Sequence, residues 1–174
     1  MSEIKLLFCG DFIPSGSYEP LIMKKKENVF GDALPLIKSS DFSFVNLETP
    51  LTLYSTSLKK SGPSLKSNPD FSKILKLFSL VGLANNHFLD FGRKGLEDTL
   101  KACTNHGVST VGAALNLKEE TQTYVANIKG IKIGILAIAE QHFNKPKDEK
   151  FGSVLMDPID NYHHIEDLKL KSDF

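Results

Sequence analysis

The stretch SLVGLANNHFLDFG at positions 79–92 joins a short apolar run to a cluster of polar side chains and a closing glycine. Residues 79–84 have the length and composition of a buried strand. The polar cluster Asn-Asn-His at 85–87 is followed by helical spacing of apolar residues from Gly95 onward. This succession of strand, polar loop and helix is typical of α/β proteins, which place functional side chains at the carboxyl ends of strands.

Two earlier apolar runs end in the same way. Residues 4–9 form a continuous apolar run with one lysine, and Gly10-Asp11 follows it. Residues 42–46 form a second β-rich run, with Glu48 just beyond its end. The sequence therefore predicts two more strands, the first of them buried, whose carboxyl ends carry acidic residues.

The rest of the pattern completes a mixed α/β fold, which we assign to one domain spanning residues 1–174. Either Asn68 or Asp70 is placed to cap a helix start. We expect a mixed sheet flanked by helices, and a self-contained doubly wound α/β domain is the alternative. The further predicted elements are a strand at 108–111, a hairpin of 123–128 with 131–139, a loop at 54–69, and helices at 32–38, 71–78, 95–105 and 161–170.

The composition restricts the partners of the chain. Its 174 residues include 21 Lys plus Arg and 21 Asp plus Glu, so the formal net charge is zero and no overall field favours nucleic acid. The basic loop 59–63 has no interleaved aromatic residues that could stack on bases. No run approaches the roughly 18 apolar residues of a membrane span. We therefore predict no nucleic-acid partner and no membrane segment.

The cysteines and the N-terminal segment predict a cytoplasmic chain. Cys9 lies in an apolar run and Cys103 lies on the apolar stripe of a predicted helix. Both fit the role of small core side chains in a reducing compartment. The apolar stretch near the N-terminus is too short and too acidic for a signal peptide.

The polar ends of the three predicted strands favour a cation site. Because the carboxyl ends of parallel strands meet at one edge of a sheet, Asp11, Glu48 and the Asn-His pair at 86–87 can converge. Carboxylate and amide oxygens are the ligands that Mg²⁺ and Mn²⁺ prefer, and an imidazole adds Zn²⁺ or Fe. Each residue also has an ordinary interpretation: a turn end for Asp11, a solvated loop charge for Glu48, and a histidine bonded to the backbone for His87.

The order of these motifs resembles a known family. Gly10-Asp11, then Asn-Leu-Glu-Thr-Pro at 46–50, then Asn-Asn-His-x-x-Asp-x-Gly at 85–92, is similar to the bacterial capsule-synthesis CapA family, also known for poly-γ-glutamate synthesis. That family looks like a branch of the calcineurin-like metallophosphatases. The resemblance runs from about residue 5 to the C-terminus and implies a calcineurin-like α/β sandwich of mixed sheets flanked by helices.

The resemblance also implies roles for individual residues. Asp11 matches the first metal-ligand aspartate, although Ile13 stands where the superfamily has a histidine. Glu48 matches the acidic position of the second motif, and Asn86 matches an amide-oxygen metal ligand. His87 matches the histidine that stabilises or protonates the leaving group. The implied metal is Mn²⁺ or Mg²⁺, with Zn²⁺ or Fe as further options.

Four more residues are expected around this centre. Asp90 would hold the His87 ring through its other nitrogen and so fix the tautomer. The resemblance places Asn46 and Asn85 beside the metal motifs, as substrate-binding residues. Lys60, in the basic loop, would meet an anionic substrate at the mouth of the site.

The resemblance further implies that the chain is a partial domain. The later family motifs, His-x-Gly-x-Glu and a Gly-His motif, do not occur in it. The ending Lys-Ser-Asp-Phe at 171–174 is similar to the segment 38–42 that leads into a predicted strand. We expect half of a metal site, no turnover by this chain alone, and self-association through uncovered apolar faces.

Two functions from different classes follow. The first is a divalent-metal hydrolase acting on a phosphoester or an amide of an anionic cell-surface polymer. The alternative is a non-catalytic accessory or binding protein of capsule-type polymer synthesis.

Overall fold

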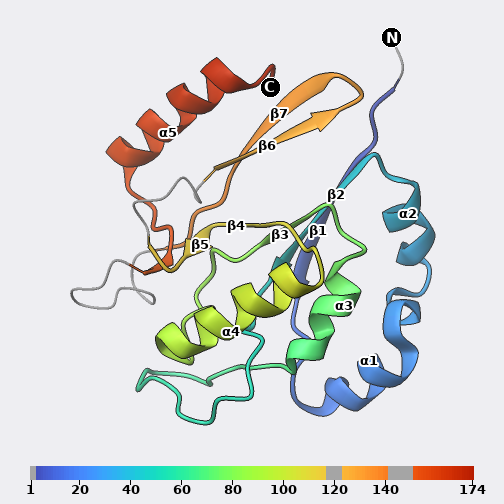
Figure 1. The fold of residues 1–174 in the computed structure, drawn as a ribbon, viewed down its shortest axis with the longest axis vertical. Helices are drawn as coiled ribbons and strands as arrows, with labels where there is room; N and C mark the ends of the chain where they lie inside the picture. The colour runs from blue at the N-terminus through green and yellow to red at the C-terminus, as the bar shows by residue number, and fades with distance from the viewer. Residues whose placement is uncertain (1–2, 117–122, 141–150) are drawn as a thin grey trace.

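The computed structural model describes residues 3–116, 123–140 and 151–174. Its centre is a parallel sheet in the order β1-β2-β3-β4 (Figure 1). The predicted mixed α/β fold is confirmed, because an antiparallel hairpin of β6 and β7 accompanies this sheet. The strands of the parallel sheet are β1 (Leu6–Phe12), β2 (Phe42–Leu47), β3 (Leu80–Gly82) and β4 (Thr110–Val111), and those of the hairpin are β6 (Thr123–Ile128) and β7 (Ile131–Leu136).

Helices cover one face of the parallel sheet and the hairpin covers the other (Figure 1). Helix α5 packs on the hairpin, so the molecule has four layers (Figure 1). The short strands β5 (Ala113–Ala114) and β8 (Gly152–Ser153) pair with each other. The helices are α1 (Glu19–Lys25), α2 (Ala33–Ser39), α3 (Ser72–Leu75), α4 (Gly92–Asn105) and α5 (Pro158–Lys171), with 3₁₀ turns η1 (Gly16–Tyr18), η2 (Lys26–Phe30) and η3 (Pro69–Phe71).

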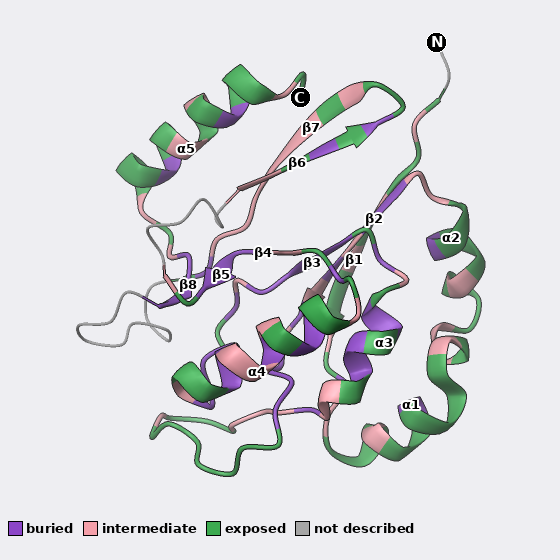
Figure 2. Cartoon of the chain, viewed as in Figure 1, coloured by how far each residue is buried: buried purple, intermediate pink, exposed green. Residues whose placement is uncertain are grey.

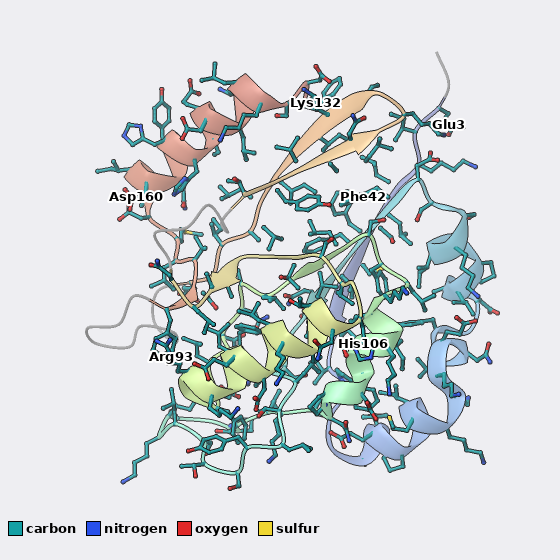
Figure 3. The ribbon with its side chains drawn as sticks, in the orientation of Figure 1. Glu3, Phe42, Arg93, His106, Lys132 and Asp160 are labelled. Carbon is teal, nitrogen blue, oxygen red and sulfur yellow. The ribbon has the colours of Figure 1, made fainter. Side chains whose placement is uncertain are left out.

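Two apolar clusters hold these layers together. The larger one lies between the sheet and the helices, and α4 turns its buried residues toward it while its outer face is exposed (Figure 2). The smaller one lies between the two sheets and includes Phe42 of β2 with Ala126 and Ile128 of β6. Figure 3 shows Phe42 between the parallel sheet and the hairpin. The alternation of side chains along β2 thus supplies both cores.

The prediction of a buried first strand at 4–9 is wrong in two respects. The strand continues to Phe12, so Asp11 lies inside it rather than in the following loop. It is also an edge strand, and on one face Leu6 and Phe8 keep 41% and 60% of their surface exposed. An apolar run identifies a strand but does not tell whether both of its faces are covered.

An irregularity in the pairing of β1 with β2 sets the direction of Asp11. Phe8 pairs with Phe44 but Asp11 pairs with Asn46, so two residues of β1 face the single residue Val45. This is the arrangement of a β-bulge, which shifts the alternation of the strand by one position. Asp11 therefore lies on the same face as Asn46.

The other predicted elements are confirmed with shifted boundaries. The helix expected at 71–78 is divided into η3 and α3 and ends at Leu75, and Asn68 rather than Asp70 caps it by accepting a hydrogen bond from the Asp70 amide. The four apolar residues that lie at helical spacing in this segment are nevertheless buried. They are Phe71, Ile74, Leu75 and Phe78. Helix α1 was not predicted, since a lysine run covers its C-terminal end.

The segment at the C-terminus already bonds to the second sheet. The amides of Asp173 and Phe174 donate to the Lys132 carbonyl, and the Gly134 amide donates to the Phe174 carbonyl at 2.7 Å. This is the hydrogen-bond pattern of parallel neighbours. The sequence prediction that 171–174 resembles the approach to a strand agrees with these bonds.

We predict that Gly112→Ala destabilises the fold by about 3 kcal/mol, measured by chemical denaturation. Gly112 has φ of +95°, and an added Cβ would lie 2.7 Å from the Cβ of Ala84 and 3.0 Å from that of Ala137. The matched control is Gly10→Ala, which meets no atom within 4 Å and should leave stability within about 0.5 kcal/mol. Equal stability of the two variants would contradict the prediction.

Candidate metal centre

Three parallel strands bring polar side chains together at their carboxyl ends. The Asn46 amide donates to the Asp11 carboxylate at 2.7 Å, and the Asn85 amide donates to the Asn46 side-chain oxygen at 3.2 Å. Asn85 also donates to the Leu47 carbonyl at 2.8 Å. We call Asp11, Asn46, Glu48, Asn85 and His87 the polar rim. The bonds among Asp11, Asn46 and Asn85 tie the ends of β1, β2 and β3 to one another.

Asn85 also shapes the loop that carries the histidine. Its side-chain oxygen accepts a hydrogen bond from the His87 amide at 3.1 Å, which forms a local turn. Asn85 is buried, and its hydrogen bond to the Leu47 carbonyl holds this turn against the end of β2. Asn86, between the two, is exposed and has no hydrogen bond to the described residues. Its amide oxygen is therefore available to a ligand.

Glu48 follows β2 and faces Asp11. Its backbone amide donates to the Phe12 carbonyl at 3.1 Å, which extends the contact between the two strands. Burial raises the pKa of the Glu48 carboxyl, and the adjacent negative charge and hydrogen bond of Asp11 raise it further, while His87 acts in the opposite direction. Two carboxylates that meet in this way repel each other, and a cation between them would relieve the repulsion.

His87 and Asp90 form a closed pair beside the rim. His87 Nδ1 lies 2.9 Å from Asp90 Oδ2, and the Asp90 side chain is 1% exposed. Since an ionised carboxylate can only accept, this bond places the proton on Nδ1 and leaves Nε2 for a substrate or a ligand. The arrangement is the one that the sequence analysis expected for these two residues.

Lys60 lies differently from the expectation of a substrate contact. Its Nζ is bound to Asp90 Oδ1 and lies 3.2 Å from His87 Nδ1. Lys66, further along this loop, donates to the Tyr54 carbonyl at 2.7 Å. Both ammonium groups are thus engaged within the chain. The sequence offered no signal for this, because Lys60 and Asp90 are thirty residues apart.

Two features of the site were not predicted from the sequence. One is the bulge before Asp11, and the other is the Leu65 amide, which donates to Asp90 Oδ2 at 2.7 Å. A backbone amide leaves no trace in a sequence pattern. The Gly10 that precedes Asp11 was the one available signal for the bulge, since glycine inside a strand often marks one.

The donors present suit a hard divalent cation in part. Within the described part of the chain, no group of three or more His, Cys, Asp or Glu side chains is placed to hold a metal ion. Asp11 and Glu48 supply two carboxylates, and Asn86, between the rim residues Asn85 and His87 in sequence, offers an amide oxygen. Oxygen donors of this kind fit Mg²⁺ or Mn²⁺ better than Zn²⁺.

The sequence was also compared with known proteins. A family model described as "Bacterial capsule synthesis protein PGA_cap" matches residues 5–170, nearly the whole chain. The chain belongs to this capsule synthesis family. The matched range contains β1, β2 and β3 with their polar ends, and the four-layer arrangement agrees with part of a calcineurin-like sandwich.

Three relatives illustrate the match. The capsule biosynthesis protein CapA of Bacillus anthracis is 30% identical over 144 residues, which cover 79% of this chain and 35% of that protein. The PGA biosynthesis protein CapA of Bacillus subtilis is 29% identical over 140 residues, covering 76% and 36% respectively. A probable polyglutamine synthesis accessory protein of Mycobacterium tuberculosis is 34% identical over 92 residues, 51% of this chain and 24% of that protein.

The two CapA relatives are much longer than the region that they share with this chain. The chain spans about a third of their length. Among the helices that the structure describes, none has the length and apolar character needed to cross a membrane.

We predict that Glu48→Gln stabilises the metal-free protein at pH 7, raising the thermal midpoint by about 1–3 °C. The substitution removes the repulsion between Glu48 and Asp11. The pKa of Glu48 is raised in the folded state above its ordinary value of 4.5, so the wild type loses stability as the pH rises through and above that value. The difference should therefore vanish below pH 4.5 in thermal scans with a chelator present.

The control for this prediction is Glu166→Gln, an exposed position on α5. It should shift the midpoint little at either pH. A Glu48→Gln variant less stable than wild type at pH 7 would show that the two carboxylates do not repel each other in the folded protein.

Proposed function

We propose that the polar rim is part of a divalent-metal hydrolase centre that acts in capsule polymer metabolism. The observation that carries this proposal is the approach of the Asp11 and Glu48 carboxylates beside His87. Burial and the neighbouring Asp11 charge raise the pKa of Glu48, and a cation between the two carboxylates would relieve their repulsion. Support also comes from the capsule synthesis family to which the chain belongs.

The residues divide into those that would hold a cation and those that would act on substrate. Asp11 and Glu48 would bind Mn²⁺ or Mg²⁺, with Asn86 supplying an amide oxygen; Zn²⁺ or Fe is a less suitable alternative for this donor set. The bound cation would activate water and polarise the scissile group. Asn46 orients Asp11 through the 2.7 Å hydrogen bond, and Asn85 orients Asn46 in turn.

His87 would serve the leaving group. Its Nδ1 is held by Asp90, so the ring is fixed with Nε2 directed away from that carboxylate. A protonated Nε2 could donate to the departing oxygen or nitrogen, which is the role of a general acid. Asn46 and Asn85, which lie at the rim, are proposed to contact substrate.

The proposed substrate is a phosphoester or an amide of an anionic cell-surface polymer. One relative is named for PGA biosynthesis and another for capsule biosynthesis, which supports a polymer of this type. Self-association of the chain, through faces such as the exposed side of β1, is also proposed.

A specific observation favours a second candidate, a non-catalytic accessory protein. Among the described residues there is no three-membered cluster of His, Cys, Asp or Glu to hold a metal, whereas a two-metal hydrolase needs several such ligands. One relative is named a probable synthesis accessory protein. An accessory protein would retain the fold and the rim but bind its polymer without cleaving it.

Metal titration separates the two candidates. We predict that the protein binds Mn²⁺ in the micromolar range by isothermal titration calorimetry, and that Asp11→Ala weakens binding by at least about tenfold because one carboxylate ligand is lost. The matched control is Asp32→Ala, an exposed aspartate at the start of α2. It should bind as the wild type does.

Turnover of bis(p-nitrophenyl) phosphate by the full-length protein, with Mn²⁺ present, completes the experiment. Binding with turnover supports the hydrolase, and binding without turnover on this and on amide substrates supports the accessory role. If wild type and Asp11→Ala bind Mn²⁺ equally, the proposed centre is wrong.

A further inference from the structure

The carboxylate of Asp90 is buried deeply and receives three hydrogen-bonding groups. The side chain is 1% exposed. The Leu65 amide and His87 Nδ1 reach Oδ2, and Lys60 Nζ reaches Oδ1. In the part of the chain that the structure describes, Lys60 is the cation in contact with this carboxylate. A buried carboxylate without such a partner would be strongly destabilising.

We propose that Lys60 is a positioning residue: it supplies the counter-charge of Asp90 and thereby holds the His87 ring in place. This assignment replaces the expectation that Lys60 contacts substrate. Lys60 Nζ contacts Asp90 and His87 Nδ1, and its side chain is 17% exposed. It would thus affect a bound substrate through these two residues. The neighbouring Lys59 is exposed, and it provides the contrast of a lysine in the same loop without this role.

The segment 58–65 is fastened around Asp90 at both ends. The Leu58 amide donates to the Asp90 carbonyl at 2.8 Å, and the Leu65 amide donates to the Asp90 carboxylate at 2.7 Å. The Leu58 side chain lies against Gly92, 3.5 Å from where a Cβ of that residue would be. Lys60 lies between these attachments, so the loop delivers its ammonium group to a fixed point.

Geometry explains why one lysine can control the histidine. Asp90 lies three residues after His87 and accepts from its ring, while Lys60 lies within 3.2 Å of the same ring nitrogen. If the charge of Lys60 is removed, the unpaired Asp90 carboxylate is stabilised when it moves toward water or when water enters beside it. Either change shifts the acceptor that fixes the ring of His87.

The first arm of the experiment uses stability and needs no activity. We expect Lys60→Met to lower the thermal midpoint by about 10 °C, because the buried charge of Asp90 loses its partner. The double variant Lys60→Met/Asp90→Asn should recover most of this loss, since neither charge remains and the amide can still accept from Leu65. Lys59→Met should equal the wild type.

A rescue of this kind distinguishes counter-charge from packing. If the double variant is as unstable as Lys60→Met or less stable, Lys60 acts through its aliphatic chain and the proposal is overturned. The proposal is equally overturned if Lys60→Met keeps the wild-type midpoint. Nitrogen-15 spectra of the histidine rings give the second readout: the His87 signals should move in Lys60→Met and those of His106 should not.

The kinetic arm rests on the proposed hydrolase function. In the full-length protein, with bis(p-nitrophenyl) phosphate and Mn²⁺, Lys60→Met should lower kcat about tenfold and leave KM within about twofold, because the histidine is displaced while substrate binding persists. A raised KM with unchanged kcat would indicate that Lys60 contacts substrate and would overturn the positioning role. If the wild type shows no turnover, the hydrolase fails, while the stability and ring-nitrogen arms still decide the role of Lys60.

Discussion

The bulge in β1 is the constraint on which the polar rim depends. With two residues of that strand facing Val45, Asp11 lies opposite Asn46 and shares its face of the sheet. In a regular strand Asp11 would lie opposite Leu47, whose side chain is fully buried in the helix-side core. A carboxylate placed there without a partner would cost several kcal/mol. One extra residue in the strand therefore moves Asp11 from the helix-side core to the polar rim, and Gly10 takes part in the bulge without a left-handed φ.

The rim and the loop 58–65 meet through a single turn. Asn85 ties the ends of β2 and β3 and forms the turn that begins the His87 loop. Three residues beyond His87, Asp90 closes the loop and binds segment 58–65 through both its carbonyl and its carboxylate. This side of the molecule is therefore built from short-range turns within the segment 85–90 and from long-range hydrogen bonds to the end of β2 and to the segment 58–65. This arrangement lets few side chains determine the position of His87.

Sequence patterns predicted the strands, the hairpin and the order of the motifs, because these follow from the alternation of apolar side chains and from glycine at turns. They predicted that Glu48 and the Asn-His pair follow strand ends, whereas Asp11 lies inside β1. Hydrogen bonds from Asn46 to Asp11 and from Asn85 to Asn46 join the ends of the three strands. Sequence patterns could not predict the bulge, which depends on how two strands pair, or the exposure of Phe8, which depends on what covers the sheet. The Lys60–Asp90 ion pair was equally inaccessible, because the two residues are thirty positions apart, with η3, α3 and β3 between them.

Two kinds of carboxylate occur in this region, and the contrast supports a functional interpretation of one of them. Asp90 is buried but has a lysine, a backbone amide and an imidazole as partners, so its charge is balanced within the chain. Glu48 is half-buried and faces another carboxylate, an arrangement that raises its pKa and opposes folding at neutral pH. Natural proteins keep such unfavourable pairs chiefly where function requires them. Asp90, whose charge is balanced within the chain, fits a positioning role. The Asp11–Glu48 pair fits a site in which a ligand supplies the positive charge. Since Mg²⁺ and Mn²⁺ take more oxygen donors than Asp11, Glu48 and Asn86 provide, water, substrate or other protein groups must complete any such site.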